Sequence, residues 1–236
     1  MQVISSPQNP RVKELVRLSA EKRQRYLSGL FVVESVKLAQ EAVLAGISVQ
    51  ELYFTEKAAE KYPQELKLIG QYAKKQYSIS QQVAEKLSSF STTQGVFCVC
   101  TLPEPKLKAD HLNAKGRYLL LSSLQDPGNL GAVIRSALAF GCDGLVLSAD
   151  CPDLYSPKVL RSAMGGVFRL PVLTVPDLRE VVVLLRQRGV EVFAAALDRS
   201  AVTPEQAILG RDGIAAVSYT HLDVYKRQGY SRLYFY

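Results

Sequence analysis

A polar turn followed by a cation is the feature of this sequence best suited to bind and activate a ligand. The turn Asp126-Pro-Gly128 follows an apolar run, and Asn129 and Arg135 come directly after it. Asn129 is expected to cap a helix, because its side-chain oxygen can accept a hydrogen bond from a free backbone amide. The N-terminus of a helix offers backbone donors to an anion, and Arg135 adds a positive charge. This stretch is therefore a candidate site for an anion.

The helix expected over residues 129–140 has an apolar stripe that turns toward a core, and Arg135 lies outside that stripe. The stripe consists of Leu130, Val133, Ile134, Ala137 and Leu138. Arg135 shares a face with Gly131 and Ala139, whose small side chains leave room for the backbone of a ligand. An ordinary strand–helix unit with a surface arginine has the same pattern. The sequence has neither a glycine-rich dinucleotide fingerprint nor a phosphate loop.

Strands and helices alternate around this turn, which indicates an α/β domain. The expected strands are residues 117–122, 144–148, 168–173 and 190–197, and the expected helices are 156–164 and 178–188. Near-continuous apolar runs such as Tyr118–Leu121 are typical of a parallel sheet covered on both faces. Residues 102–113 contain two prolines and several charges, so we expect a domain boundary there.

The segment before this boundary predicts a small α/β sandwich. Helical spacing over residues 4–27 is followed by strands at 29–34, 49–54, 76–79 and 94–101, with helices between them. The first helical segment is the densest basic stretch of the chain. Its cations are Arg11, Lys13, Arg17, Lys22, Arg23 and Arg25. They either contact phosphate or form a solvated helix face.

The charge balance favours a polyanionic partner. Lys and Arg number 29 against 22 Asp and Glu, so the net charge is +7. The four cysteines form no Cys-x-x-Cys pair and there are only two histidines, so we expect no metal site and reduced cysteines. No stretch has the length and apolarity of a membrane span or a signal peptide, so we expect a cytoplasmic protein.

Two longer motifs carry a resemblance to a known family. Gln125-Asp-Pro-Gly-Asn-Leu-Gly-Ala-Val-Ile-Arg-Ser-Ala137, followed by Phe140-Gly141, resembles the first motif of the SpoU (TrmH-like) RNA methyltransferases of the SPOUT superfamily. The stretch from Ser156 to Pro171 resembles the second motif, with Ser156, Arg161 and Gly165 at matching positions. The N-terminal segment, including Phe31-Val-Val-Glu34, is similar to the L30e-like RNA-binding domain that many members carry.

The resemblance implies a fold and an activity. The fold would be a small L30e-like α/β sandwich followed by a SPOUT-type parallel-sheet domain with a trefoil knot. The activity would be 2′-O-methylation of the ribose in structured RNA, ribosomal RNA being favoured over tRNA, by a homodimer that uses S-adenosylmethionine (SAM). Asn129 and Arg135 match the catalytic residues of the first motif. Since a guanidinium almost never loses its proton, Arg135 is better suited to orient phosphate and stabilise alkoxide charge than to act as a base.

Further site residues follow from the same resemblance. SAM would lie against the end of the strand 190–197, with Ala195, Ala196 and Leu197 as candidate contacts. RNA would contact Glu34 and Arg161 in addition to the basic N-terminal helix, where Arg11, Lys13, Arg23 and Arg25 are the candidates. Arg161 has an alternative as an ordinary exposed helix arginine. Asn129 has an alternative as a purely structural cap.

The third motif of the family, which forms most of the SAM pocket and closes the knot, is not found after Val217. We therefore expect an RNA-binding domain at residues 1–104, an incomplete methyltransferase domain at 105–217 and a tail at 218–236. Five tyrosines in that tail suggest foreign sequence appended to a truncated chain; the alternative is an interaction tail whose aromatic rings stack on bases.

Two other functions remain open from the sequence. An RNA-binding protein without methyltransferase activity would result if the SAM site is incomplete. A doubly wound nucleotide-binding enzyme is disfavoured by the absence of a glycine-rich fingerprint after the first strand of the second domain.

Overall fold

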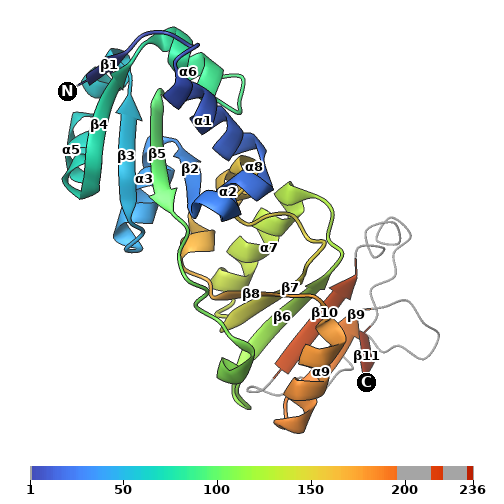
Figure 1. Ribbon diagram of the computed structural model, residues 1–236. Coiled ribbons are helices and arrows are strands. Elements are labelled where there is room, and N and C mark those ends of the chain that lie inside the picture. The colour runs from blue at the N-terminus through green and yellow to red at the C-terminus, as the bar shows by residue number, and fades with distance from the viewer. Residues whose placement is uncertain (1, 196–213, 220–232, 236) are drawn as a thin grey trace. The chain divides into compact units, whose positions relative to one another are not determined.

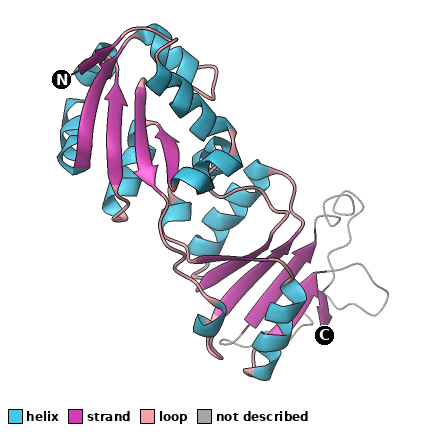
Figure 2. Cartoon of the chain, in the orientation of Figure 1, coloured by secondary structure: helices cyan, strands magenta, loops and turns pink. Residues whose placement is uncertain are grey.

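The computed structural model describes residues 2–195, 214–219 and 233–235, the last two ranges by their backbone alone. The chain forms two compact units, each built around one β-sheet (Figures 1 and 2). The first unit comprises Met1–Glu104 with Asp153–Phe168, and the second comprises Pro105–Pro152 with Arg169–Tyr236.

The sheet of the first unit has the strand order β1-β4-β3-β5-β2. The strands are β1 (Gln2–Ile4), β2 (Leu30–Glu34), β3 (Val49–Phe54), β4 (Ala73–Ile79) and β5 (Val96–Thr101). Strands β1, β4 and β3 run parallel, whereas β5 is antiparallel to both of its neighbours, β3 and β2. Burial of β5 from Val96 to Cys100 shows that both faces of this sheet are covered. Burial raises the pKa of the Cys98 thiol on β5 to about 12, so this thiol stays protonated at neutral pH.

Helices cover both faces of that sheet. They are α1 (Pro10–Ala20), α2 (Lys22–Ser28), α3 (Val36–Leu44), α4 (Glu56–Lys61), α5 (Pro63–Tyr72), α6 (Gln81–Leu87) and α8 (Pro157–Ala163). Helices α1 and α6 pack together over Tyr53, Tyr77 and Phe97, while α3 packs against α5 (Figure 1). Helix α8 packs on β2, so the second motif contributes to the first unit.

The sheet of the second unit has the order β11-β9-β10-β6-β7-β8. The strands are β6 (Arg117–Ser122), β7 (Gly144–Ser148), β8 (Val172–Val175), β9 (Glu191–Ala195), β10 (Ile214–Tyr219) and β11 (Leu233–Phe235). All pairs are parallel except β11 with β9. Strand β7 is buried along its whole length, as expected for a parallel sheet with both faces covered.

Two helices of the second unit pack through apolar stripes. Helix α9 (Leu178–Gln187) buries Leu178, Val181 and Leu185 in a core with residues of β6, β7 and β9. Helix α7 (Pro127–Ala139) buries Leu130, Gly131, Ile134 and Ala137, which agrees with the expected stripe at three positions and adds Gly131. The short 3-10 turns η1 (Ala109–His111), in the second unit, and η2 (Gly166–Phe168), in the first unit, complete the described elements.

The expected α/β class with a parallel second sheet is confirmed, and three local expectations are wrong. The basic N-terminal segment is two helices, because the backbone at Glu21 is extended. Helix α5 was not expected; Pro63 stands at its first position, where a missing N–H costs nothing. Residues 166–168 form a 3-10 turn and the strand begins only at Val172. Of the tail expected at 218–236, residues 218–219 and 233–235 belong to β10 and β11, and the remainder lies outside the described residues.

Candidate functional site

The polar turn lies at the carboxyl edge of the second sheet. Strands β6 and β7 are parallel neighbours, so the loops that follow them leave the sheet on the same side. The Ser123 amide, just after β6, donates to Ser148 Oγ at the end of β7 (2.8 Å), and Ser148 Oγ donates to Asp150 Oδ1 (2.5 Å). Hydrogen bonds from Ser123 and then Ser148 hold the pKa of the Asp150 carboxyl below its usual value. These bonds tie together the two loops that border the site.

The cap of helix α7 is Asp126, not Asn129 as expected. Asp126 Oδ1 accepts a hydrogen bond from the Asn129 amide at 2.8 Å, and Pro127 occupies the first helical position. A cap must precede the first turn, and the helix begins two residues earlier than the apolar periodicity indicated. The Asn129 side chain is exposed, and within the described residues it makes no hydrogen bond. It is therefore available to a ligand.

Arg135 projects from helix α7 with an exposed side chain. Within the described part of the chain its guanidinium forms neither a hydrogen bond nor an ion pair. Ala139, one turn later, is also exposed, whereas Gly131 belongs to the buried stripe. The small-residue face expected on both sides of Arg135 is therefore present on one side only.

One of the three cofactor candidates, Ala195, lies at the same edge. Ala195 ends strand β9 and is half-buried; Ala196 and Leu197 lie outside the described residues. In the parallel ladder Ala195 pairs with Ser218 of β10, and Ser218 pairs with Leu121 of β6. Two strand spacings, about 10 Å, therefore separate Ala195 from Leu121 near the end of β6.

Arg25 is a buried structural residue in the first unit, which corrects its expected place among the RNA contacts. It is 2% exposed, and its Nε donates to Asp153 Oδ2 at 2.7 Å. Its Nη1 donates to the carbonyls of Leu18 (2.6 Å) and Ser19 (2.9 Å). A guanidinium this deeply buried, with its Nε and Nη1 donors already used inside the protein, cannot reach phosphate. The pair instead attaches residues 153–168 to helix α2.

The other basic candidates lie in two environments. Arg11 is half-buried: its guanidinium lies 4.7 Å from the centroid of the Tyr77 ring, donates to Tyr77 Oη at 2.7 Å and pairs with Glu51. Lys13 on α1 and Arg23 on α2 are exposed. Lys13 and Arg23 therefore present positive charge at the surface, where a polyanion could contact it. The Arg11 guanidinium is instead mostly occupied by Glu51 and Tyr77 of the same unit.

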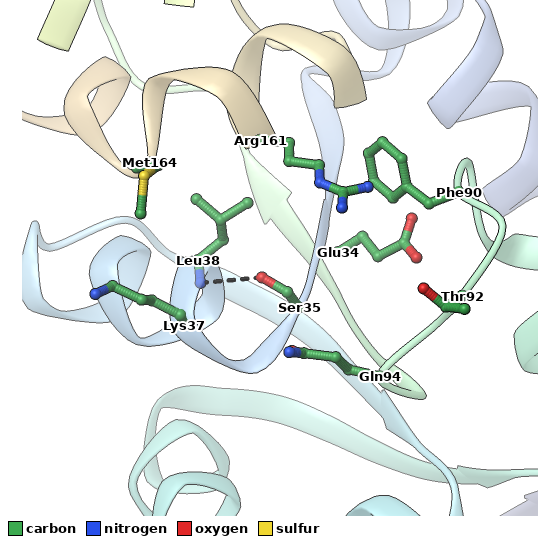
Figure 3. A pocket seen from close by; sticks show the side chains of 9 residues that line it. All are labelled: Glu34, Ser35, Lys37, Leu38, Phe90, Thr92, Gln94, Arg161 and Met164. Atoms are coloured by element: carbon green, nitrogen blue, oxygen red, sulfur yellow. Dashed lines mark hydrogen bonds between the residues drawn. The ribbon is translucent and has the colours of Figure 1, made fainter.

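Glu34 and Arg161, far apart in sequence, line one pocket of about 380 Å³ in the first unit (Figure 3). Glu34 Oε1 accepts from Ser88 Oγ, and Oε2 accepts from the Ser89 amide at 3.0 Å. The Arg161 guanidinium lies 3.9 Å from the centroid of the Phe90 ring. Four residues that were not expected from the sequence also line this pocket: Ser35, Phe90, Gln94 and Met164. Their one signal in the sequence is an aromatic residue inside the polar run 88–94.

Two further properties of the described residues concern metal ions and membranes. Within residues 2–195 and the short strands beyond them, His, Cys, Asp and Glu side chains form no group of three that would hold a metal ion. Among the described helices none combines the length and apolarity needed to cross a bilayer.

Comparison with known proteins matches both parts of the chain. Residues 116–217 match the SpoU rRNA Methylase family, and residues 9–98 match the MRM3-like substrate binding domain. The 23S rRNA (guanosine(2553)-2′-O)-methyltransferase RlmP of Bacillus subtilis is 32% identical over 92% of this chain and 82% of its own length. The 23S rRNA (adenosine(1067)-2′-O)-methyltransferase of Streptomyces azureus is 24% identical, covering 84% of this chain and 72% of that protein. A crystal structure described as an RNA 2′-O ribose methyltransferase superposes with a TM-score of 0.77 at 29% identity, over 92% of this chain and 81% of that one.

Proposed function

This chain belongs to the SpoU rRNA methylase family, and from that premise we propose that it methylates the 2′-hydroxyl of a ribose in ribosomal RNA with SAM as donor. The observation that carries this is the relationship to the B. subtilis enzyme, which extends over 92% of the chain and thus across both units. An RNA-binding protein without methyltransferase activity is not favoured, because the relatives that match across both units are named as rRNA 2′-O-methyltransferases.

The carboxyl edge of the second sheet supplies the catalytic groups in this proposal. Bound SAM supplies a methyl group on a positively charged sulfur. Arg135, a permanent cation, binds the phosphate next to the target ribose and stabilises the negative charge that grows on the 2′-oxygen as its proton leaves. Asn129, whose side chain is not used as the helix cap, orients the ribose or the guanidinium. Ala195, together with Ala196 and Leu197, contacts the cofactor.

The first unit supplies RNA binding in the same proposal. Lys13 and Arg23 offer surface charge to phosphates, and Glu34 and Arg161 meet in a pocket on this unit. Arg11 adds a minor contact, since Glu51 and Tyr77 already occupy its guanidinium. Functionally, residues 1–104 bind RNA and residues 105–217 carry methyl transfer, with 153–168 completing the surface of the first unit. A trefoil knot, a homodimer and a cytoplasmic location are further parts of the proposal, and all three rest on membership of the family.

Methyl transfer to rRNA tests the proposal directly. The chain is incubated with tritiated SAM and rRNA lacking 2′-O-methylation, and the RNA is digested to nucleosides. Label in one 2′-O-methylnucleoside is the expected result. Label confined to base-methylated nucleosides, or no label above that of heat-denatured protein, would contradict it.

A further inference from the structure

The pocket that holds Glu34 and Arg161 is assembled from three segments of the first unit. Glu34, Ser35, Lys37 and Leu38 come from the junction of β2 and α3; Phe90, Thr92 and Gln94 come from the loop before β5; Arg161 and Met164 come from α8 (Figure 3). Its volume of about 380 Å³ is within the range of small-ligand sites, which is roughly 300–1,000 Å³. Acidic, cationic, aromatic and apolar side chains converge there, which is the composition of a site that recognises a flat polar ligand.

Two residues of this pocket have strained backbones. Ser35 has φ 108° and ψ 150°, a region used almost only by glycine, and Met164 has φ 49°. In the part of the chain that the structure describes, Ser123 beside the motif-one turn is the only other non-glycine residue with positive φ. Such conformations cost about 1–3 kcal/mol each and persist mainly where a site requires them. The strain is therefore concentrated at the pocket and at the proposed catalytic turn.

Arg161 and Phe90 form a stacking platform. Arg161 Cζ lies over the Phe90 ring at 3.9 Å from its centroid, and Figure 3 shows the two groups above the Glu34 carboxylate. Within the described residues the guanidinium makes no hydrogen bond or ion pair, so its N–H groups are available to a ligand. Planar cations and aromatic rings are the groups on which proteins stack unpaired bases.

Glu34 has acceptor sites left free in the pocket. Its two oxygens each accept one hydrogen bond, from Ser88 and Ser89, and a carboxylate has about four acceptor sites, so about two remain. Among the four RNA bases only guanine presents two adjacent donors, N1–H and N2–H, on its Watson–Crick edge. Adenine and cytosine place an acceptor beside a donor, and uracil places its one donor between two acceptors.

We propose that this pocket binds one unstacked guanine of the RNA, with Glu34 accepting from N1–H and N2–H and the Arg161–Phe90 platform stacking on the base. Lys37 at the rim is exposed and attracts the adjoining phosphate. The inference rests on the proposed function only in taking RNA as the ligand. All residues that carry it belong to the first unit.

The test compares two RNA hairpins without SAM. Their loops are uridine except for one guanosine in the first and one inosine, which lacks the 2-amino group, in the second. Fluorescence anisotropy should give about tenfold tighter binding of the guanosine hairpin by the unaltered chain, because one charge-assisted hydrogen bond is lost with inosine. In Glu34→Gln the preference should fall below about twofold, whereas Glu60→Gln, an equal charge change at an exposed position of α4, should retain it.

Equal affinity of the unaltered chain for the two hairpins, including no binding of either, would overturn the proposal, and this comparison depends on no variant being folded. Retained preference in Glu34→Gln would overturn it as well. Methyl transfer to rRNA without a guanine preference would support the proposed methyltransferase activity and overturn the proposed guanine pocket. A guanine preference without methyl transfer would support the pocket and overturn the activity, so the two proposals fail separately.

Discussion

The turn after β6 and the pocket next to β2 hold polar groups by different means. At the turn, Asp126, Asn129 and Arg135 are close in sequence. Asp126 Oδ1 accepts from the Asn129 amide, and Ser148 Oγ accepts from the Ser123 amide just before the turn. In the pocket, Glu34, Phe90 and Arg161 come from distant segments. The segment that carries Arg161 is held by the buried Arg25–Asp153 ion pair and by the close approach of Gly165 to Glu41. The proposed chemistry therefore depends on a local motif, whereas the proposed recognition depends on tertiary packing. Substitutions remote from each site should therefore damage the pocket more than the turn.

Breaking the Arg25–Asp153 pair should have the largest effect on stability. Arg25→Ala leaves the Asp153 carboxylate, which is 5% exposed, without its partner, so the free energy of unfolding should fall by about 3–5 kcal/mol. Urea denaturation measures the change. Arg23→Ala, a neighbouring exposed arginine, is the control and should change it by less than about 0.5 kcal/mol. Equal effects of the two would mean that segment 153–168 is not anchored through Arg25.

Filling the space at Gly165 should have the next largest effect. Gly165 has φ +83°, and an added Cβ would lie 2.8 Å from Glu41 Cβ. Gly165→Ala should therefore cost about 3 kcal/mol, the sum of backbone strain and overpacking. Gly46→Ala, with φ +77° and no atom within 4 Å, carries the strain alone and should cost about 1 kcal/mol. If thermal or urea unfolding gave the same loss of stability for Gly165→Ala and Gly46→Ala, α3 would not pack closely on the second motif.

Relieving the strain at Ser35 should stabilise the protein. Ser35→Gly removes the positive-φ penalty, and loss of the cap to the Leu38 amide costs only a few tenths of a kcal/mol when glycine replaces serine, so we expect a gain of about 1 kcal/mol. Ser80→Gly, at a cap with φ −70°, has no strain to relieve and should destabilise slightly. Loss of stability in Ser35→Gly would show that the conformation is not strained.

Protonation of Asp150 should give the smallest effect. Its folded-state pKa is depressed, so its hydrogen bonds with Ser123 and Ser148 stabilise the fold above the pKa of the unfolded chain and are lost as the pH falls through that value and below it. Asp150→Asn should thus be slightly less stable than the parent at pH 7 and equal to it near pH 2. The side chain is exposed, so water and salt weaken the contribution. A stability difference that does not change with pH would contradict this origin.

The same contrast between local motifs and tertiary packing explains which features the sequence predicted and which it did not. Apolar periodicity identified the parallel strands β6 and β7 and the buried stripe of α7, because these patterns are set by burial alone. It missed the start of α7, where Asp126 and Pro127 decide the cap, and the role of Arg25, whose partner is 128 residues away. The pocket residues Ser35, Phe90 and Met164 could not be predicted, since neither strain nor a contact between distant segments leaves a periodic signal.

We propose that Arg135 at the sheet edge acts in methyl transfer and that the first unit acts in RNA binding. The most direct test compares three proteins: the unaltered chain, Arg135→Ala and Arg186→Ala. For each, the single-turnover rate of methylation at saturating RNA and the Kd for RNA are measured. Arg186, exposed on α9, is the matched control. We predict that Arg135→Ala lowers the rate about 100-fold or more and changes the RNA Kd less than about threefold, while Arg186→Ala changes neither. An unchanged rate of Arg135→Ala at saturating RNA would contradict this proposal. A rate loss that is seen only below saturating RNA would contradict it as well, because it would place Arg135 in RNA binding.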